Sequence, residues 1–218
     1  MPEDSKKHAI IAPMGAFKNH VRWLMMLSYP DLGIDRDRML SEVYPAQRTW
    51  HNWLAYEWKF RELPQLHSRI AVAHDATDIN DHRDSWLFLS CDPQLCLRSY
   101  VKWNSSLNNR TIRWFLEQVE RTNAQYLIDA GERKPSLVLD SSLLYQPELD
   151  PKFYHSIRHF FGLDDAYEDA AVIHSAWFHL HNKSESEMLR DLASLFDQSY
   201  DFTQEYKQPF SHSIDFNR

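Results

Sequence analysis

The chain has 218 residues and a mass of 26.0 kDa, which is enough for one large domain. Hydrophobic residues make up 43% of it and aromatic residues 14%, a composition that excludes a disordered chain. The net charge is −7 and no run of Lys or Arg exceeds two, which argues against a nucleic-acid-binding protein.

Four short apolar segments predict the strands of a sheet. Segments with helical spacing of apolar residues separate them, and this alternation is typical of an α/β fold with a parallel sheet. The expected strands are 8–12, 69–73, 86–90 and 136–140. The expected helices are 19–28, 47–62, 93–107, 110–130 closed by Gly131, 151–161 ended by Gly162, 165–180 and 185–197, followed by a surface segment at 198–218.

The turn after the first strand combines a glycine, a lysine and the start of a helix. Gly15 lets the backbone approach a ligand, and the amides at a helix N-terminus attract anions. Lys18 adds a positive charge. The turn is therefore either an anion-binding loop or an ordinary strand-to-helix turn. The candidate binding residues are Gly15, Ala16, Phe17, Lys18, Asn19 and His20.

The next two strands are also followed by polar residues. His74 comes directly after the second strand, where an imidazole could act as a general base; it could equally be a surface histidine. After the third strand, Arg98, Ser99 and Lys102 lie on neighbouring turns of a helix. A cationic pair with a hydroxyl suits a phosphate, although a solvated helix surface has the same pattern. Because ligands bind beyond the carboxyl ends of parallel strands, we expect these segments to meet.

In this order, the three segments resemble the sulfotransferase family, which uses 3′-phosphoadenylyl sulfate. In that family a PKSGTTW-type loop holds the 5′-phosphosulfate, a KTHLP-like strand end carries the catalytic His, and an R-D/N-P motif with S-Y six residues later holds the 3′-phosphate. Here the corresponding segments are APMGAFKNHVRW, VAHD and CDPQLCLRSY. The segment SLVLDSSLLYQPELDPKFYHSIRHFFGL is similar to the family's strand–loop–helix. The run WHNWLAYEW is similar to short members from marine phages and bacteria.

The resemblance covers about residues 8–163 and implies a three-layer, P-loop-like sheet in a single domain, 1–218, with a helix-rich extension at 164–218. It implies transfer of a sulfuryl group from 3′-phosphoadenylyl sulfate to a small-molecule or glycan hydroxyl or amine, leaving 3′,5′-ADP. His74 would be the base, and Lys18 would act on the bridging oxygen. The loop residues 15–20 would hold the phosphosulfate, and Ser99 with Arg98 or Lys102 would hold the 3′-phosphate.

The sequence departs from the family pattern where charge matters most. Cys91 replaces the arginine of the third motif, and Phe17, Lys18, Asn19 and His20 replace the SGTT hydroxyls. One lost charge-assisted contact costs on the order of 1.5–3 kcal/mol. An alternative is therefore a catalytically degenerate protein that serves as a component of an assembly, for example a virus particle. A kinase or nucleotide hydrolase is a third hypothesis, but no hydroxyl follows Lys18 as GxxxxGKS/T requires.

The remaining expectations concern metals, partners and compartment. The histidine-rich stretches lack an HExxH or paired-cysteine spacing, so no metal site is predicted. Two cysteines, no signal peptide and no long apolar span predict a cytoplasmic protein with reduced thiols, or one in the host cytoplasm or virion if phage-encoded. We expect no membrane partner, and a homo-oligomer or a larger assembly is an open alternative.

Overall fold

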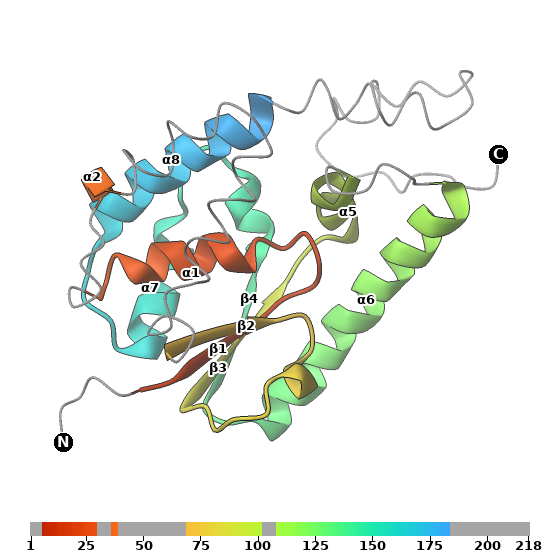
Figure 1. Cartoon of the computed structure of the whole chain (residues 1–218), viewed down its shortest axis with the longest axis horizontal. Coiled ribbons are helices and arrows are strands. Elements are labelled where there is room, and N and C mark those ends of the chain that lie inside the picture. The colour runs from red at the N-terminus through yellow and green to blue at the C-terminus, as the bar shows by residue number, and fades with distance from the viewer. Residues whose placement is uncertain (1–5, 30–35, 39–68, 102–107, 184–218) are drawn as a thin grey trace.

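The computed structural model describes residues 6–29, 36–38, 69–101 and 108–183. Its centre is a parallel sheet of four strands in the order β2-β1-β3-β4 (Figure 1). The strands are His8–Ile11 (β1), Ile70–Ala73 (β2), Ser85–Ser90 (β3) and Ser136–Asp140 (β4). The predicted α/β class and the four predicted strands are confirmed.

Strand β1 runs through the middle of the sheet. His8 pairs with Ile70 on one side and with Ser85 on the other, and β3 continues the sheet to β4 from Trp86 and Ser136 onward. Because the central strands are covered on both faces, their inner residues are apolar rather than alternating with polar ones, and polar residues stand only at strand ends.

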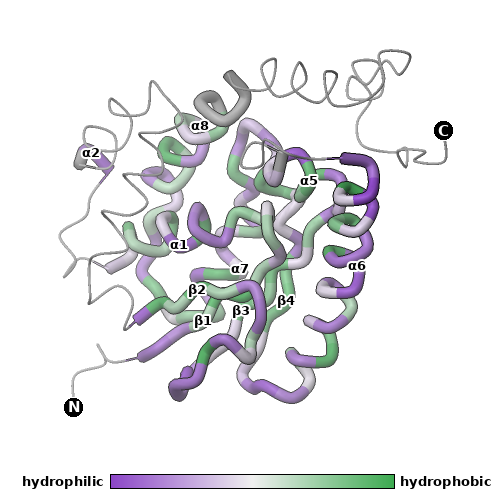
Figure 2. The backbone as a smooth tube through the Cα atoms, turned by 45° about the vertical axis from the view of Figure 1, so that its right-hand side comes forward, coloured by the Kyte–Doolittle hydropathy of each residue, from purple (hydrophilic) through white to green (hydrophobic). Residues whose placement is uncertain are grey.

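Helices cover both faces of the sheet (Figures 1 and 2). On one face, Ile10 and Leu87 belong to a large hydrophobic cluster that also takes side chains from the five helices α1, α5, α6, α7 and α8. On the other face, Ala9 and Phe88 pack with Tyr126 of the long helix α6. These helices span Lys18–Met26 (α1), Pro93–Val101 (α5), Asn109–Glu132 (α6), Pro151–Phe161 (α7) and Tyr167–Lys183 (α8).

Side-chain caps explain where several of these helices begin. Asp150 accepts a hydrogen bond from the Phe153 amide at 2.8 Å and so starts α7, and Gly162 ends it with a φ of 66°, as predicted. The predicted end of α6 at Gly131 is wrong. The helix continues to Glu132, because a glycine inside a helix weakens it without ending it.

Three short elements complete the description: α2 (Arg36–Arg38) and the 3-10 turns η5 (Ala76–Asp78) and η6 (Ser141–Tyr145). The predicted segments 47–62, 185–197 and 198–218 lie outside the described residues, as does the end of the helix predicted to reach 107. None of the helices in the described ranges has both the length and the apolarity needed to cross a bilayer.

Candidate functional site

The strand order identifies the edge of the sheet where a ligand would bind. The chain leaves β1 toward β2 on one side and leaves β3 toward β4 on the other, so the carboxyl ends of β1 and β3 form a topological switch point. All strands are parallel, and the segments after β1, β2 and β3 therefore emerge at this same edge. The three segments predicted to carry the chemistry thus share one end of the sheet.

The loop after β1 is held close to helix α5. The Ala16 amide donates to the Pro13 oxygen at 3.2 Å, and Gly15 adopts a φ of +93°. A Cβ on Gly15 would lie 2.4 Å from the carbonyl oxygen of Cys96. Both the positive φ and the close approach require glycine at this position.

Phe17 has the next unusual conformation in the loop. It occupies the N-cap of α1 with a φ of 57°, a left-handed conformation that costs a non-glycine residue about 1 kcal/mol. Its ring packs on Tyr145 and on Trp177, with centroid distances of 4.5 and 4.6 Å. This packing offsets the strain and fixes where α1 begins. The first residue of the helix is then Lys18.

Lys18 meets His74 at the opening of the site. The Nζ atom of Lys18 lies 2.9 Å from both ring nitrogens of His74, and Nδ1 of His74 lies 3.0 Å from the Ala12 oxygen. A carbonyl oxygen can only accept, so Nδ1 carries the ring hydrogen and donates it to Ala12. Nε2 is therefore the nitrogen with the lone pair, and the Lys18 ammonium group lies against the ring at equal distance from both nitrogens.

The surroundings keep His74 neutral. Desolvation and, after it, the positive charge of Lys18 lower the pKa of His74 to about 4, against the opposing effects of the Ala12 carbonyl and Asp78. At neutral pH the ring is consequently unprotonated, as a general base must be before it reacts.

The backbone of His74 is held by two further contacts. The hydroxyl of Tyr126 donates to the His74 oxygen at 2.6 Å. Asp75 accepts from the Thr77 amide and hydroxyl at 2.8 and 2.7 Å, which lowers the pKa of its carboxyl group and caps η5. Asp75 therefore shapes the turn after β2 and does not bind the His74 ring.

Lys18 and His74 line a cleft of about 630 Å³ that runs along the β2 side of the sheet. Arg83 also lines the cleft and donates to Asp81 at 2.8 and 3.0 Å. The lining thus combines cationic side chains, Lys18 among them, with the carboxylates of Asp78 and Asp81. Its lining residues are Lys18, Arg22, Ala71, Val72, Ala73, His74, Asp78, Ile79, Asn80, Asp81 and Arg83.

The segment after β3 differs from the phosphate-binding segment that the resemblance implies. Cys91 is buried, with its amide donating to the Asn123 side chain at 3.2 Å and its oxygen accepting from the same amide group at 2.7 Å. Asp92 caps α5 by accepting from the Gln94 and Leu95 amides at 2.7 and 3.2 Å. The position of the family arginine is therefore taken by an interior cysteine whose backbone is held by Asn123 of α6.

The predicted residues of α5 lie apart from the cleft. Ser99 is buried and Arg98 is half-buried, and neither lines the cleft beside His74. Lys102 lies outside the described residues. The structure therefore brings Lys18 and His74 together in the cleft, and Arg98 and Ser99 do not line it.

His20 points into the protein interior. Its Nε2 lies 2.9 Å from Nδ1 of His174, whose Nε2 lies 2.8 Å from the Gln146 oxygen. Because that oxygen only accepts, His174 donates to it and accepts from His20. The His20 ring also stacks on Trp177 at 4.0 Å, while Asn19 is half-buried on the same first turn of α1. His20 thus supports the packing of α1.

Several residues that hold the loop and the site in place were not among the site residues predicted from the sequence. Tyr145 donates from its hydroxyl to the Gly15 oxygen at 3.1 Å and to the Leu95 oxygen, and so joins the loop to α5. Tyr126 and His174 likewise act across long sequence separations. None of the three belongs to a local motif. The sequence feature nearest to Tyr145 is the apolar strand that ends at Asp140, five residues earlier.

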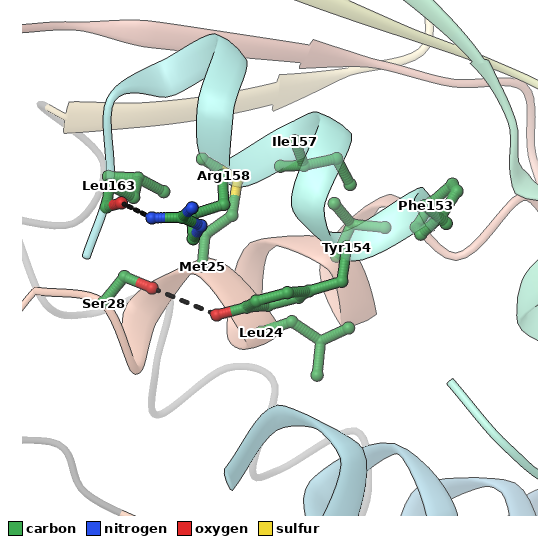
Figure 3. Close-up of a pocket in the computed structure, with 9 residues that line it drawn as sticks. Leu24, Met25, Ser28, Phe153, Tyr154, Ile157, Arg158 and Leu163 are labelled. Carbon is green, nitrogen blue, oxygen red and sulfur yellow. Dashed lines mark hydrogen bonds between the residues drawn. The ribbon is translucent and has the colours of Figure 1, made fainter. Parts of the chain in front are cut away.

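A second cavity lies between α1 and α7 (Figure 3). Its volume of about 10 Å³ is at the lower limit for a single water molecule. Ser28 and Tyr154 are 3.4 Å apart at their hydroxyl oxygens, and Arg158 donates to the Leu163 oxygen at 3.3 Å. The cavity is a packing gap between two helices and is too small for a substrate.

Within the described ranges, no three His, Cys, Asp or Glu side chains are grouped as metal ligands. Neither the family models nor the curated proteins nor the solved structures give a significant match to this chain. The cleft and the Lys18–His74 pair are the features of the described residues that bear on function.

Proposed function

We propose that the chain transfers a sulfuryl group from 3′-phosphoadenylyl sulfate to a hydroxyl or amine acceptor, with His74 as the base and Lys18 as the cation on the donor. The observation that carries this proposal is the 2.9 Å contact between Lys18 Nζ and His74 Nε2. These are the residues to which the resemblance assigns donor binding and proton removal, and 56 positions separate them in the chain.

The described residues suit the phosphosulfate end of the donor. Lys18 is the first residue of α1, and the first turn of this helix has no acidic side chain to compete for its amides. Helix amides and a lysine form a favourable environment for a phosphate or sulfate group. The open cleft beside His74 leaves room for an acceptor.

Each residue then has a defined task in the reaction. The donor supplies a sulfuryl group whose transfer forms the acceptor–sulfur bond and breaks the sulfur–oxygen bond to the 5′-phosphate, leaving 3′,5′-ADP. Nε2 of His74 takes the proton from the acceptor. Lys18 donates a hydrogen bond to the oxygen on which negative charge develops, a type of stabilisation that is strongest in a partly desolvated site.

A second candidate is a binding module that has kept the fold but lost catalysis. The burial of Cys91 and Ser99 favours it, since these positions would hold the 3′-phosphate in the family. Such a module could form a homo-oligomer or a larger assembly, including a virus particle. A P-loop-like fold and a cytoplasmic location are part of both candidates and remain proposals.

Calorimetric titration with 3′,5′-ADP separates the two candidates, with 5′-AMP as the matched ligand that lacks the 3′-phosphate. The transferase proposal predicts binding of 3′,5′-ADP at sub-millimolar concentration and weaker binding of 5′-AMP. Absence of 3′,5′-ADP binding, together with a stable oligomer by light scattering, would instead support the binding module.

A further inference from the structure

We propose that the outer edge of β2 binds an extended peptide as an added strand, and that a serine or threonine of this peptide is the acceptor. The peptide site follows from the cleft and the sheet, whereas the acceptor role rests on the proposed function. The acceptor is thereby narrowed from any hydroxyl or amine to a hydroxyl carried on a polypeptide in the β conformation.

The backbone of Val72 faces away from the rest of the sheet. Among the described residues, β1 is the only strand that pairs with β2, so β2 forms one edge. The Ala73 oxygen accepts from the Ala12 amide at 3.2 Å and therefore points toward β1. The backbone groups of successive residues in a strand point to opposite sides. The amide and the carbonyl of Val72 consequently point outward, where a further strand could bind to them.

The cleft beside His74 lies over this edge. Part of its lining comes from β2 itself, from residues 71–73. Lys18 lines one side and belongs to α1, which packs on one face of the sheet. Asp78 lines the other side and belongs to η5, whose Ala76 is buried in the cluster on the opposite face. A cleft that is lined by a strand and by elements from both faces of its sheet opens over the edge of that strand.

An extended peptide is the ligand that matches this edge. Its backbone presents an amide and a carbonyl on the same side at every second residue, which is the pattern that an edge strand can pair with. The β2 sequence IAVA has no charged residue and no proline, the features by which proteins usually prevent an exposed edge from pairing. The cleft volume of about 630 Å³ falls in the range typical of ligand sites.

The position of His74 determines which residue of the peptide would react. The Val72 side chain packs with the cluster on the face that α1 covers, and residues two apart in a strand share a face. The ring of His74 points to the same face, where it meets Lys18. A peptide serine paired opposite His74 directs its hydroxyl there as well. Its proton goes to Nε2 while its oxygen bonds to the sulfuryl sulfur and the bond from sulfur to the 5′-phosphate breaks.

Asp78 determines which neighbours this serine should have. The residues before and after the serine point to the opposite face, on the side of the cleft that Asp78 lines. The charge of Asp78 raises the pKa of His74, so its carboxylate lies near the reacting position. We therefore expect lysine or arginine on either side of the serine to be favoured and glutamate to be disfavoured, because like charges repel.

The test is the binding of the peptide TVKSKVT with blocked ends, measured by calorimetry on the full chain without nucleotide. N-methylation of one alternate set of its backbone amides should weaken binding about tenfold or more, and methylation of the other set should not, because only one edge of the peptide pairs with β2. The peptide TVESEVT should bind about two- to fivefold more weakly than TVKSKVT. Asp78→Asn should remove this difference.

Val72→Pro tests the edge from the side of the protein. It removes the outward amide hydrogen and leaves the groups that face β1 in place, a change that edge strands tolerate. Peptide binding should weaken about fivefold, whereas Val72→Thr keeps the amide and the branched shape and should bind as the wild type does. If Val72→Pro fails to fold, the two methylated peptides still decide the question.

The outcomes separate this inference from the proposed function. Absence of TVKSKVT binding in a protein that binds 3′,5′-ADP overturns the peptide site and leaves the transferase proposal standing. Equal weakening by both methylated sets overturns strand addition. Peptide binding without any binding of 3′,5′-ADP keeps the edge site and refutes sulfuryl transfer. When 3′-phosphoadenylyl sulfate is added, mass spectrometry should find the sulfate on the serine, and its absence there would refute the acceptor role.

Discussion

The hydroxyl of Tyr126 lies 2.6 Å from the backbone oxygen of His74 and donates a hydrogen bond to it. Burial raises the pKa of Tyr126, so the phenol stays protonated and remains a donor. The ring of the same tyrosine packs on Phe88 of β3 at 5.5 Å. One side chain of α6 thus connects the base of the site to the core of the sheet.

Tyr126→Phe keeps the ring packing and removes the hydrogen bond. We expect a loss of about 1 kcal/mol in the free energy of unfolding, measured with urea, because a carbonyl oxygen loses its partner. We also expect the ring signals of His74 to change. Tyr167→Phe is the control, since Tyr167 donates to the Leu149 oxygen at 2.9 Å away from the site. It should cost similar stability and leave His74 unaltered; identical His74 spectra in both variants would refute the positioning role.

Gly15→Ala tests how tightly the loop is held against α5. The new methyl group would lie 2.4 Å from the Cys96 oxygen in a backbone with a φ of +93°. We expect the free energy of unfolding to fall by more than about 2 kcal/mol. Gly131→Ala in α6 meets nothing within 4 Å and should raise stability by about 0.5–1 kcal/mol. Equal effects of the two substitutions would contradict the described loop.

The agreement between sequence and structure is greatest where the signal is local. Four apolar runs correspond to four strands, and Asp150 and Gly162 mark both ends of α7. Gly131 misled the prediction of α6, because the same residue type occurs at helix ends and, at a cost, within helices. Such a choice depends on contacts beyond the helix itself.

The site was predictable only in part for the same reason. Lys18 and His74 each follow a strand, and parallel strands end at one edge, so their meeting could be expected before the structure was known. The inward direction of His20 could not, because it depends on His174, 154 positions away. The burial of Cys91 likewise depends on Asn123 of α6.

His8 should make the protein less stable in mild acid. Its Nδ1 lies 2.7 Å from the Ser85 hydroxyl, and burial lowers its pKa from 6.5 to about 4, against the effect of Asp84. Between these two pKa values the unfolded chain binds a proton that the folded protein does not. Stability is therefore complete above pH 6.5 and falls by about 3 kcal/mol as the pH decreases to 4.

The variant His8→Asn isolates this effect, because it keeps a polar group near Ser85 and does not titrate. Urea unfolding at pH 7 and pH 5 should show a smaller decrease for the variant than for the wild type, by about 2 kcal/mol. The comparison is made within each variant, so a lower overall stability of His8→Asn does not affect it. The same decrease in both proteins would show that His8 is not the titrating group.

The affinity of 3′,5′-ADP for the Lys18→Met variant tests the central claim most directly. If Lys18 holds the donor at the mouth of the cleft, its loss should weaken binding about tenfold or more, since a hydrogen bond to a charged group contributes about 1.5–3 kcal/mol. Lys7→Met should bind as the wild type does. Unchanged affinity in Lys18→Met, measured by calorimetry beside these two proteins, would contradict the role of the Lys18–His74 pair as a donor site.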